Sequence, residues 1–308
     1  MDYATAYEAA HTALELWPRT CQGLVVPSGT SASSVFGVRI DGATHFLRLT
    51  NQSFRKLDDA TDEVAFLSHL HARGVRVAMP VASIHARNVE KVGGYLAVMF
   101  RRAPGFRVTS EGRYWDQAFF RAWGYALALQ HEAARSFDNP SLGWRQDWRR
   151  EPVLVDGLAK IRATDQQLAQ TADTILADLD AQASVFGEVA TVHNDMAPQN
   201  FRYKPQDGIT AFDFDNCCRH WLLHDIAVSL SVLRLRPERE QLARWIFEGY
   251  RDVRPLPGDP VSIRLLLRLR LLYVYCDRLY SFGAAPQPEQ ANILNAFRHR
   301  LIRDDVWS

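Results

Sequence analysis

The chain has 308 residues, of which 47% are hydrophobic and 23% are charged. This composition is typical of a folded protein with one large unit or two lobes, and it excludes a disordered chain, a collagen-like fibre and a disulfide scaffold. Basic and acidic residues almost cancel, at 36 against 35. No overall field would recruit nucleic acid or an anionic membrane, so we expect neither as a partner.

The first residues and the cysteines bear on location. Residues 1–17 carry three acidic side chains and neither lysine nor arginine, which is unlike a signal peptide. The most apolar later stretch, residues 226–233, is much shorter than the ~20 residues that a membrane helix needs. Four cysteines without C-x-x-C spacing favour reduced thiols. We therefore expect a cytoplasmic protein, as a monomer or a homodimer.

The first hundred residues predict a small lobe of sheet and helix. Apolar residues at helical spacing predict an opening helix over residues 2–17. Asp41-Gly42 separates two short β-branched runs, which is a strong hairpin signal. A helix over residues 59–73 follows, with Gly74 as its end. The predicted strands are residues 24–26, 35–40, 44–49, 81–85 and 95–100.

After Pro104-Gly105 the sequence turns to helical periodicity. We therefore expect an N-terminal lobe over residues 1–102 and a C-terminal lobe over residues 103–308. Within the second lobe, residues 189–214 predict two short strands around a turn. The predicted helices are residues 115–135, 163–179, 220–235, 238–251, 261–282 and 289–306.

His193, Asp195 and Asn200 have the spacing H-x-D-x-x-x-x-N. In protein kinases this is the spacing of the catalytic loop, where the aspartate orients the acceptor hydroxyl and the asparagine holds magnesium. A hairpin is expected to follow and to lead into Asp213 and Asp215. A turn centred between residues 206 and 207 would place Asn200 opposite Asp213, and a turn one residue later would place it opposite Asp215.

Either register gathers carboxylate and amide oxygens, which are the hard ligands that suit Mg²⁺. Magnesium is the ion that phosphoryl transfer uses to neutralise the terminal phosphates. One alternative is that these side chains only cap turns or face solvent from a strand edge. Another is a metallohydrolase site that would use His193, Asp195, His220 and His224, although no H-E-x-x-H motif supports it.

At these motifs the chain resembles the aminoglycoside phosphotransferase and choline-kinase-like family, the small-molecule branch of the protein-kinase-like fold. The resemblance extends over about residues 24–280 and is most specific at residues 193–200, 212–216 and 224–227. It implies an α+β, bilobal kinase-like fold with the active site between the lobes. The smaller lobe would hold an antiparallel sheet and one helix, and the larger lobe would be mainly helical.

The resemblance also implies roles for individual residues. Asp195 would be the catalytic base, and Asn200 and Asp213 would hold the metal ion, with Asp215 beside them. Asp225, in the downstream Asp-Ile-Ala, would support the catalytic loop from behind.

In the first lobe the chain departs from the family. The family has a lysine on the third strand that contacts phosphates and pairs with a helix glutamate. Here Arg48 occupies that position and Glu63, on the inward stripe of its helix, suits the partner. An arginine can bind phosphate with two donors while it pairs with the glutamate. One alternative is that Arg48 and Glu63 form a purely structural ion pair. A second is that Lys56 contacts the phosphates in place of Arg48.

The nucleotide is expected to be ATP or GTP. The resemblance places its phosphates at a loop with a single glycine and its base at the segment between the lobes. The candidate contacts are Ser28, Gly29, Thr30, Ser31, Arg48, Glu63, Met99, Phe100 and Arg101.

The acceptor is expected to be a small molecule with a hydroxyl. Residues 234–308 hold 13 arginines against 9 acidic residues, which disfavours a polycationic aminoglycoside. A sugar, a nucleoside, an amino acid or another antibiotic-like compound is then the expected acceptor. A polar-aromatic helix end is a candidate lining of the acceptor site. That end comprises Tyr273, Tyr275, Asp277, Arg278 and Tyr280. Two other functions stay open, a stress-type Ser/Thr protein kinase and a nucleotide-binding pseudokinase.

Overall fold

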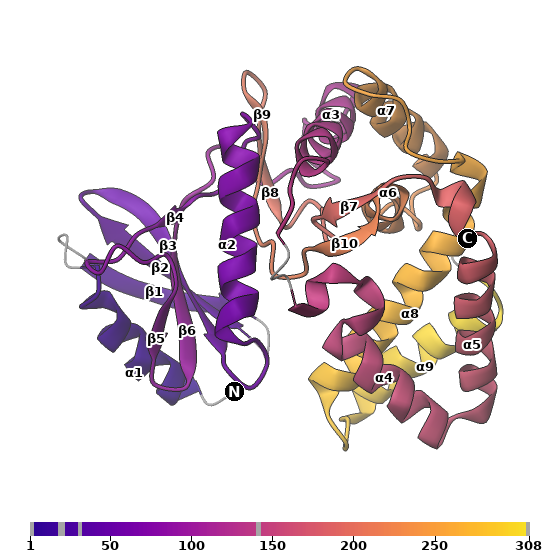
Figure 1. Ribbon diagram of the computed structural model, residues 1–308, viewed down its shortest axis with the longest axis horizontal. Coiled ribbons are helices and arrows are strands. Elements are labelled where there is room, and N and C mark those ends of the chain that lie inside the picture. The colour runs from indigo at the N-terminus through magenta and orange to yellow at the C-terminus, as the bar shows by residue number, and fades with distance from the viewer. Residues whose placement is uncertain (1–2, 18–21, 30–32, 140–142, 306–308) are drawn as a thin grey trace.

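The computed structural model describes residues 3–17, 22–29, 33–139 and 143–305 of the chain. An antiparallel sheet with two helices forms the N-terminal part, and a larger, mainly helical part follows (Figure 1). The α+β, bilobal architecture expected from the sequence is confirmed.

The N-terminal sheet has the strand order β1-β2-β3-β6-β4, and β5 pairs with β6. The expected hairpin at Asp41-Gly42 is present, because both residues take positive φ angles of 49° and 79° between β2 and β3. The predicted strand over residues 81–85 is wrong, since β4 has only two residues and β5 precedes the Gly93-Gly94 turn. The strands are β1 (Gln22–Gly29), β2 (Ser33–Ile40), β3 (Ala43–Asn51), β4 (Pro80–Val81), β5 (Glu90–Val92) and β6 (Tyr95–Arg101).

Helix α1 (Tyr3–Leu14) packs against the sheet on the side away from the helical part (Figure 1). Its buried alanines, Ala6, Ala10 and Ala13, let the helix approach the sheet closely. Together with Leu47 and Met99 from the strands they form a separate small core.

Helix α2 (Leu57–Ala72) stands between the sheet and the helical part (Figure 1). It begins two residues before the expected start, and Asp59 accepts a hydrogen bond from the backbone N–H of Lys56. Phe66 and Leu70 belong to the large core of the helical part, where the Phe66 ring lies 5.9 Å from that of Phe214. The helix therefore packs into the core of the helical part, while its Glu63 is hydrogen-bonded to Arg48 of the sheet.

The C-terminal part contains seven α-helices among its described residues. Helix α4 was not predicted, because Gly157 in its middle lowers helix propensity. A Cβ on Gly157 would come within 2.4 Å of the Cβ of Cys276, so the glycine allows α4 to pack closely on α8. The helices are α3 (Gln117–Ala134), α4 (Pro152–Thr164), α5 (Gln166–Ala181), α6 (Leu222–Ser231), α7 (Arg239–Arg251), α8 (Ile263–Phe282) and α9 (Pro288–Ile302), and short 3₁₀ turns are Gly143–Gln146, Trp148–Arg150, Ala183–Phe186 and Pro260–Ser262.

Two small sheets interrupt the helices. β7 (Val189–Val192) pairs with β10 (Cys218–Trp221), and β8 (Phe201–Lys204) pairs with β9 (Gly208–Ala211). The prediction of only two strands is wrong, and so is the helix start at His220, which lies in β10. The segment has two sheets because β7 finds its partner beyond the hairpin.

The register of the β8–β9 hairpin also differs from both predicted registers. Phe201 pairs with Ala211, and the backbone N–H of Phe212 donates to the carbonyl of Asn200 at 2.9 Å. Asn200 is therefore opposite Phe212, one residue before Asp213. The register differs because the turn has three residues, 205–207, between the paired Lys204 and Gly208. Gly208 has a φ of +84°, which glycine adopts without strain.

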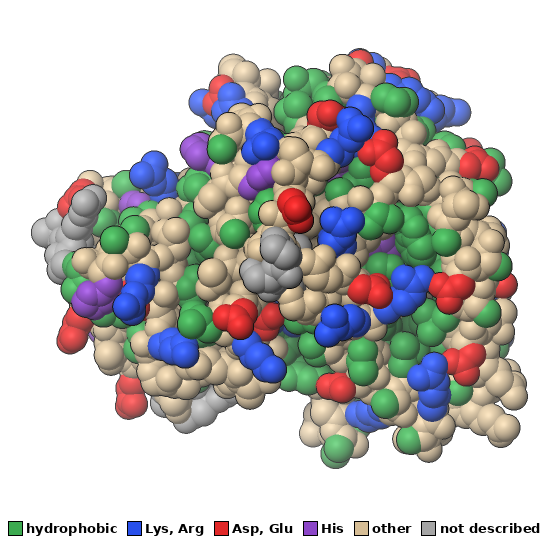
Figure 2. Space-filling view, in the orientation of Figure 1, with side chains coloured by type: hydrophobic (Ala, Val, Ile, Leu, Met, Phe, Trp, Pro, Cys, Tyr) green, Lys and Arg blue, Asp and Glu red, His purple; other side chains and the backbone are tan. Residues whose placement is uncertain are grey.

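Figure 2 shows acidic and basic side chains interspersed on one face of the molecule, in keeping with the near-zero net charge. No helix among the described residues is long and apolar enough to span a membrane. Cys217, Cys218 and Cys276 are buried free thiols, and Cys21 lies outside the described residues.

Candidate active site

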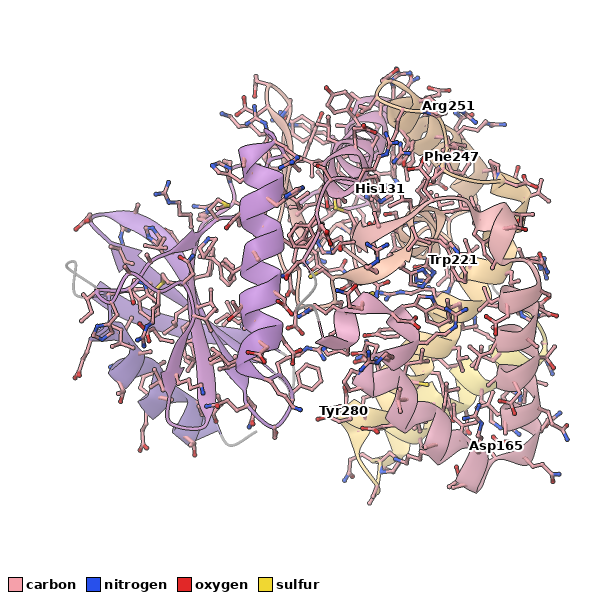
Figure 3. The ribbon with its side chains drawn as sticks, viewed as in Figure 1. His131, Asp165, Trp221, Phe247, Arg251 and Tyr280 are labelled. Carbon is pink, nitrogen blue, oxygen red and sulfur yellow. The ribbon has the colours of Figure 1, made fainter. Side chains whose placement is uncertain are left out.

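The loop between β7 and β8 carries Asp195, and a buried carboxylate holds this loop in place. Asp225, on α6, accepts the backbone N–H groups of His193 at 3.2 Å and Asn194 at 2.8 Å. His131 of α3 (Figure 3) contacts the same carboxylate at 3.1 Å. Burial opposes the charge of Asp225, but these hydrogen bonds and nearby histidines outweigh it and lower its pKa. Asp225 thus lies behind the loop, where the sequence placed it.

His193 links the loop to the hairpin. Its Nε2 lies 3.1 Å from the carbonyl of Phe212, and its Nδ1 lies 3.3 Å from the backbone nitrogen of Asp195. Its ring packs against Phe214 with centroids 4.1 Å apart. The histidine therefore sets the position of Asp195 relative to the strand that leads into Asp213.

The metallohydrolase alternative gains no support. His220 and His224 stack on each other with ring centroids 3.8 Å apart, deep in the core. Burial lowers the pKa of His224 to about 3, so the ring stays neutral. In the part of the chain that the structure describes, no three His, Cys, Asp or Glu side chains form a group that could hold a metal.

Asp195 presents a partly exposed carboxylate with two donors on it. Asn200 Nδ2 donates to Oδ2 at 2.8 Å, and Arg270 Nη2, from α8, donates to Oδ1 at 2.5 Å. The Asp195 side chain is 22% exposed. Asp195 and Asn200, which are five residues apart in the sequence, are thus in contact as predicted. The contact of Arg270 with Asp195 was not predicted.

Asp213 directly follows the hairpin and takes a positive φ of 66°. Its side chain is half exposed, and Nη1 of Arg48 lies 3.7 Å from its Oδ1. The packed surroundings, and then the carboxylates of Asp215 and Glu63, raise the pKa of Asp213 to about 7, although Arg48 opposes the shift. Such a carboxylate gains from a bound cation.

Asn200 and Asp213 are the residues that fit a magnesium ion best. Asn200 uses its Nδ2 on Asp195, and no donor among the described residues reaches its Oδ1. The amide oxygen of Asn200 and the carboxylate of Asp213, whose pKa is raised, are oxygen ligands of the kind that Mg²⁺ prefers.

Asp215 is engaged elsewhere. Its carboxylate accepts Nε of Arg55 at 3.2 and 3.3 Å, and the same guanidinium reaches Glu151 and Asn216, each at 3.3 Å. Burial opposes the charge of Asp215, but Arg55, Arg48 and Arg145 outweigh it and lower its pKa. This cluster ties the loop after β3 to the helical part.

Arg48 and Glu63 form the contact that the sequence predicted. Nη1 donates to Oε1 at 3.0 Å and Nη2 donates to Oε2 at 2.5 Å, so the pair is bidentate. Both side chains are buried, at 7% and 0% exposure. Because Nη1 also faces Asp213, the arginine lies between the sheet and the catalytic loop. Lys56 is exposed at the start of α2.

The remaining predicted nucleotide contacts lie along β1 and β6. Ser28 and Gly29 pair with Val35 and Ser34 of β2, and Thr30 and Ser31 lie outside the described residues. On β6, Met99 is buried, while the Phe100 ring lies 5.1 Å below the Arg48 guanidinium and Arg101 is exposed. The backbone N–H of Arg101 donates to the carbonyl of Met79, and Met99 and Phe100 pair with both β3 and β4.

The helix end that was predicted to line the acceptor site points partly toward the other lobe. Tyr273 OH lies 3.5 Å from Asn216, and Tyr280 (Figure 3) packs against Phe54 of the N-terminal part at 5.6 Å. Tyr275 is buried, and Asp277 pairs with Arg278 at 3.6 Å.

Sequence reasoning missed three arginines: Arg55, Arg145 and Arg270. Arg145 donates to the carbonyls of Asp215, Cys217 and Asp59 and is fully buried. For Arg270 one signal was present in the sequence, because an arginine among leucines in a predicted amphipathic helix needs a polar partner when it is buried. The sequence could not say which partner.

Comparisons with known proteins identify the family of this chain. Residues 23–256 match the model of the phosphotransferase enzyme family. The amicoumacin kinase of Bacillus subtilis is 28% identical over 85% of this chain and 82% of its own length. A homoserine kinase of Xanthobacter autotrophicus is 27% identical over 83% and 79%.

A solved structure of an amicoumacin kinase, in complex with AMP-PNP, Ca²⁺ and Ami, covers all of this chain and 95% of its own, with a TM-score of 0.83 and 22% identity. That likeness shows the fold. The family match extends over most of the chain and includes the catalytic loop, the hairpin and Asp225. The chain therefore belongs to the phosphotransferase enzyme family and is a small-molecule kinase, which transfers a phosphoryl group to a hydroxyl acceptor.

Proposed function

We propose that this kinase transfers the γ-phosphoryl group of ATP to a hydroxyl of a small molecule held between the lobes. The observation that carries the proposal is the convergence of Asp195, Asn200 and Asp213 with Arg48. Asp195 lies 2.8 Å from Asn200, and Arg48 lies 3.7 Å from Asp213. These are the four parts that positioning and charge neutralisation require for phosphoryl transfer.

In the proposed reaction the acceptor oxygen forms a bond to the γ-phosphorus, and the bond from that phosphorus to the bridging β–γ oxygen breaks. The proton of the acceptor hydroxyl passes to the Asp195 carboxylate, and ADP leaves with the electron pair of the broken bond. Asp195 acts as general base through its partly exposed oxygens. Positioning and electrostatics supply most of the rate enhancement.

We propose Asn200 and Asp213 as the residues that hold Mg²⁺. Magnesium, when bound, neutralises the β- and γ-phosphate oxygens. Asp215 is proposed beside them, because a carboxylate that accepts Nε of Arg55 still has lone pairs for a cation. Asp213, with its raised pKa, would bind a cation in its deprotonated form.

Arg48, held by Glu63, is proposed to contact the nucleotide phosphates. The backbone near Ser28, Gly29, Thr30 and Ser31 would follow the phosphates, and the segment from Met99 to Arg101 would lie near the base, with ATP preferred to GTP. In the pseudokinase alternative Arg48 would point to solvent and Glu63 would pair elsewhere, and the bidentate contact argues against it.

The acceptor class rests on the relatives and on charge. The curated relatives act on amicoumacin and homoserine, and the arginine-rich C-terminal residues disfavour a polycation. An amino-acid-like or antibiotic-like hydroxyl compound is the proposed class. The buried free thiols of Cys217, Cys218 and Cys276 support a cytoplasmic location, and we propose residues 1–102 and 103–308 as the two lobes.

A thermal shift with Mg-ATP, followed by phosphate-transfer assays on a panel of hydroxyl compounds, tests the function. The panel includes homoserine, which carries a carboxylate and an amine, 4-hydroxybutanoate, which carries only the carboxylate, and 3-amino-1-propanol, which carries only the amine. Sugars, nucleosides and a generic Ser/Thr peptide complete it. We expect stabilisation by Mg-ATP and phosphorylation of a small molecule. Absence of both nucleotide binding and ATP turnover would refute the proposal, and transfer only to the peptide would indicate a protein kinase.

A further inference from the structure

Arg270, near the middle of α8, lies on the catalytic carboxylate. Its Nη2 donates to Oδ1 of Asp195 at 2.5 Å, and its Nη1 donates to the carbonyl of Asn194 at 3.4 Å. Among the described residues, Asp195 is the one ion-pair partner of Arg270. The contact joins residues 75 positions apart, so packing of α8 against the catalytic loop creates it.

We propose that Arg270 binds an anionic group of the acceptor, and that its contact with Asp195 is the alternative partner it holds between substrates. The inference rests on the proposed function and adds a substrate class, a hydroxyl compound with a carboxylate or similar anion. It also assigns Arg270 as a specificity-determining residue.

The first argument is that the pair can exchange. The two side chains are 14% and 22% exposed and share a single short contact. Such a pair is weaker than a fully buried bidentate pair, because water still reaches both partners. A ligand carboxylate can therefore replace Asp195 on the guanidinium.

The second argument is that a replacement partner must be anionic. Arg270 lies close to His224, whose ring stays neutral because burial and Arg270 lower its pKa. The nearest other acid on α8, Asp277, is seven residues further on and already pairs with Arg278. A guanidinium that left Asp195 for a neutral or cationic acceptor would be a partly desolvated cation without a counter-charge, which is unfavourable.

The third argument concerns the chemistry of Asp195. Its Oδ2 already accepts Asn200, and its Oδ1 accepts Arg270. An acceptor hydroxyl would have to share this carboxylate with both donors. If the acceptor's anion draws Arg270 away, Oδ1 is freed as the hydroxyl arrives, whereas water brings no anion and leaves the contact in place. Arg270 would thereby suppress transfer of the phosphoryl group to water.

The test measures Mg-ATP hydrolysis without any acceptor. Arg270→Gln is expected to hydrolyse ATP about fivefold faster than the wild type, on the scale of a partly exposed ion pair, and Arg270→Lys should fall between them. Arg264→Gln is the matched control, because Arg264 is on the same helix and pairs with Asp304 at the surface. A hydrolysis rate of Arg270→Gln equal to or below that of the wild type would overturn the inference.

A second arm uses acetate as the anionic probe, against chloride at equal ionic strength. We expect acetate to raise wild-type hydrolysis in a saturable manner and to leave Arg270→Gln unchanged. No response of the wild type to acetate would overturn the anion assignment. Wild-type protein that neither binds nor hydrolyses Mg-ATP would instead refute the proposed kinase function, so the two failures are distinct.

Discussion

Two arginine–carboxylate pairs serve the site, and they are built in opposite ways. Arg48 and Glu63 join a central strand to α2 through two contacts, with side chains 7% and 0% exposed. The Arg270 and Asp195 side chains, on α8 and a loop, share one contact and are 14% and 22% exposed. A buried fork is costly to break and stays in place, whereas a partly exposed single contact can be exchanged.

The difference follows from the elements that carry the residues. Arg48 lies on β3, which β2 and β6 flank on both sides. Asp195 lies on a loop that is held from behind by Asp225 and is open on its other face. In the proposed site, the pair that would contact the nucleotide is thus fixed, and the pair that would serve the acceptor is adjustable.

The largest expected effect comes from removing the catalytic carboxylate. Asp195→Asn should lower kcat by about 10²–10⁴-fold, the usual contribution of a general base, because the proton of the acceptor then has no carboxylate to receive it. The affinity for Mg-ATP should change little. Steady-state kinetics and nucleotide titration check this, with Asp165→Asn, a surface helix cap far from the site, as control. An equally large loss of nucleotide affinity would contradict the role.

The next prediction compares the two pairs directly through stability. Arg48→Met leaves Glu63 buried and unpaired and should lower the free energy of unfolding by about 3–5 kcal/mol. Arg270→Met should cost less than about 1 kcal/mol. Denaturant unfolding measures both, and equal losses would remove the distinction between a fixed and an adjustable pair.

Two further variants separate charge from geometry at the fixed pair. The double variant Arg48→Met/Glu63→Met should be more stable than Arg48→Met alone, because no charge is left buried without a partner. Arg48→Lys keeps the charge but loses the fork, so it should restore only part of the stability and of the nucleotide affinity.

The last prediction concerns the buried His224, whose effect on stability is close to zero at neutral pH and appears only in acid. Burial lowers the pKa of His224 from about 6.5 to about 3, so the unfolded chain binds a proton that the folded chain refuses between these values. Stability should therefore fall as the pH drops below about 6.5, with a slope of up to about 1.4 kcal/mol per pH unit from this residue.

His224→Leu removes that titration, and no hydrogen bond to its Nδ1 is lost among the described residues. The difference in unfolding free energy between wild type and variant should thus change steadily in the variant's favour from pH 6.5 downward. Parallel pH profiles of the two proteins would show that His224 ionises normally in the fold.

Residues close in sequence were predicted well. The spacing of His193, Asp195 and Asn200 predicted a loop in which Asp195 and Asn200 are in contact, and the Asp41-Gly42 turn and most helices were placed to within a few residues. Arg48 and Glu63 could be paired because the family resemblance implies a strand cation that pairs with a helix glutamate, and the helix periodicity puts Glu63 on the inward face. The prediction of the hairpin register was wrong because the register depends on the number of turn residues, and the residue types in the turn do not determine that number.

The sequence by itself determined which residue types stand in the loop of Asp195 and which chemistry they suit, and its resemblance to the family implied that Arg48 stands where a lysine is usual. Only the tertiary structure decided that Arg270 lies on Asp195, that Arg55 pairs with Asp215, and that α2 packs into the core of the helical part while its Glu63 pairs with the sheet. The physical reason is that local pattern tells which face of an element is apolar, while packing of those faces decides how elements far apart in the chain are placed against each other. Contacts between residues 75 or 160 positions apart exist only after that placement.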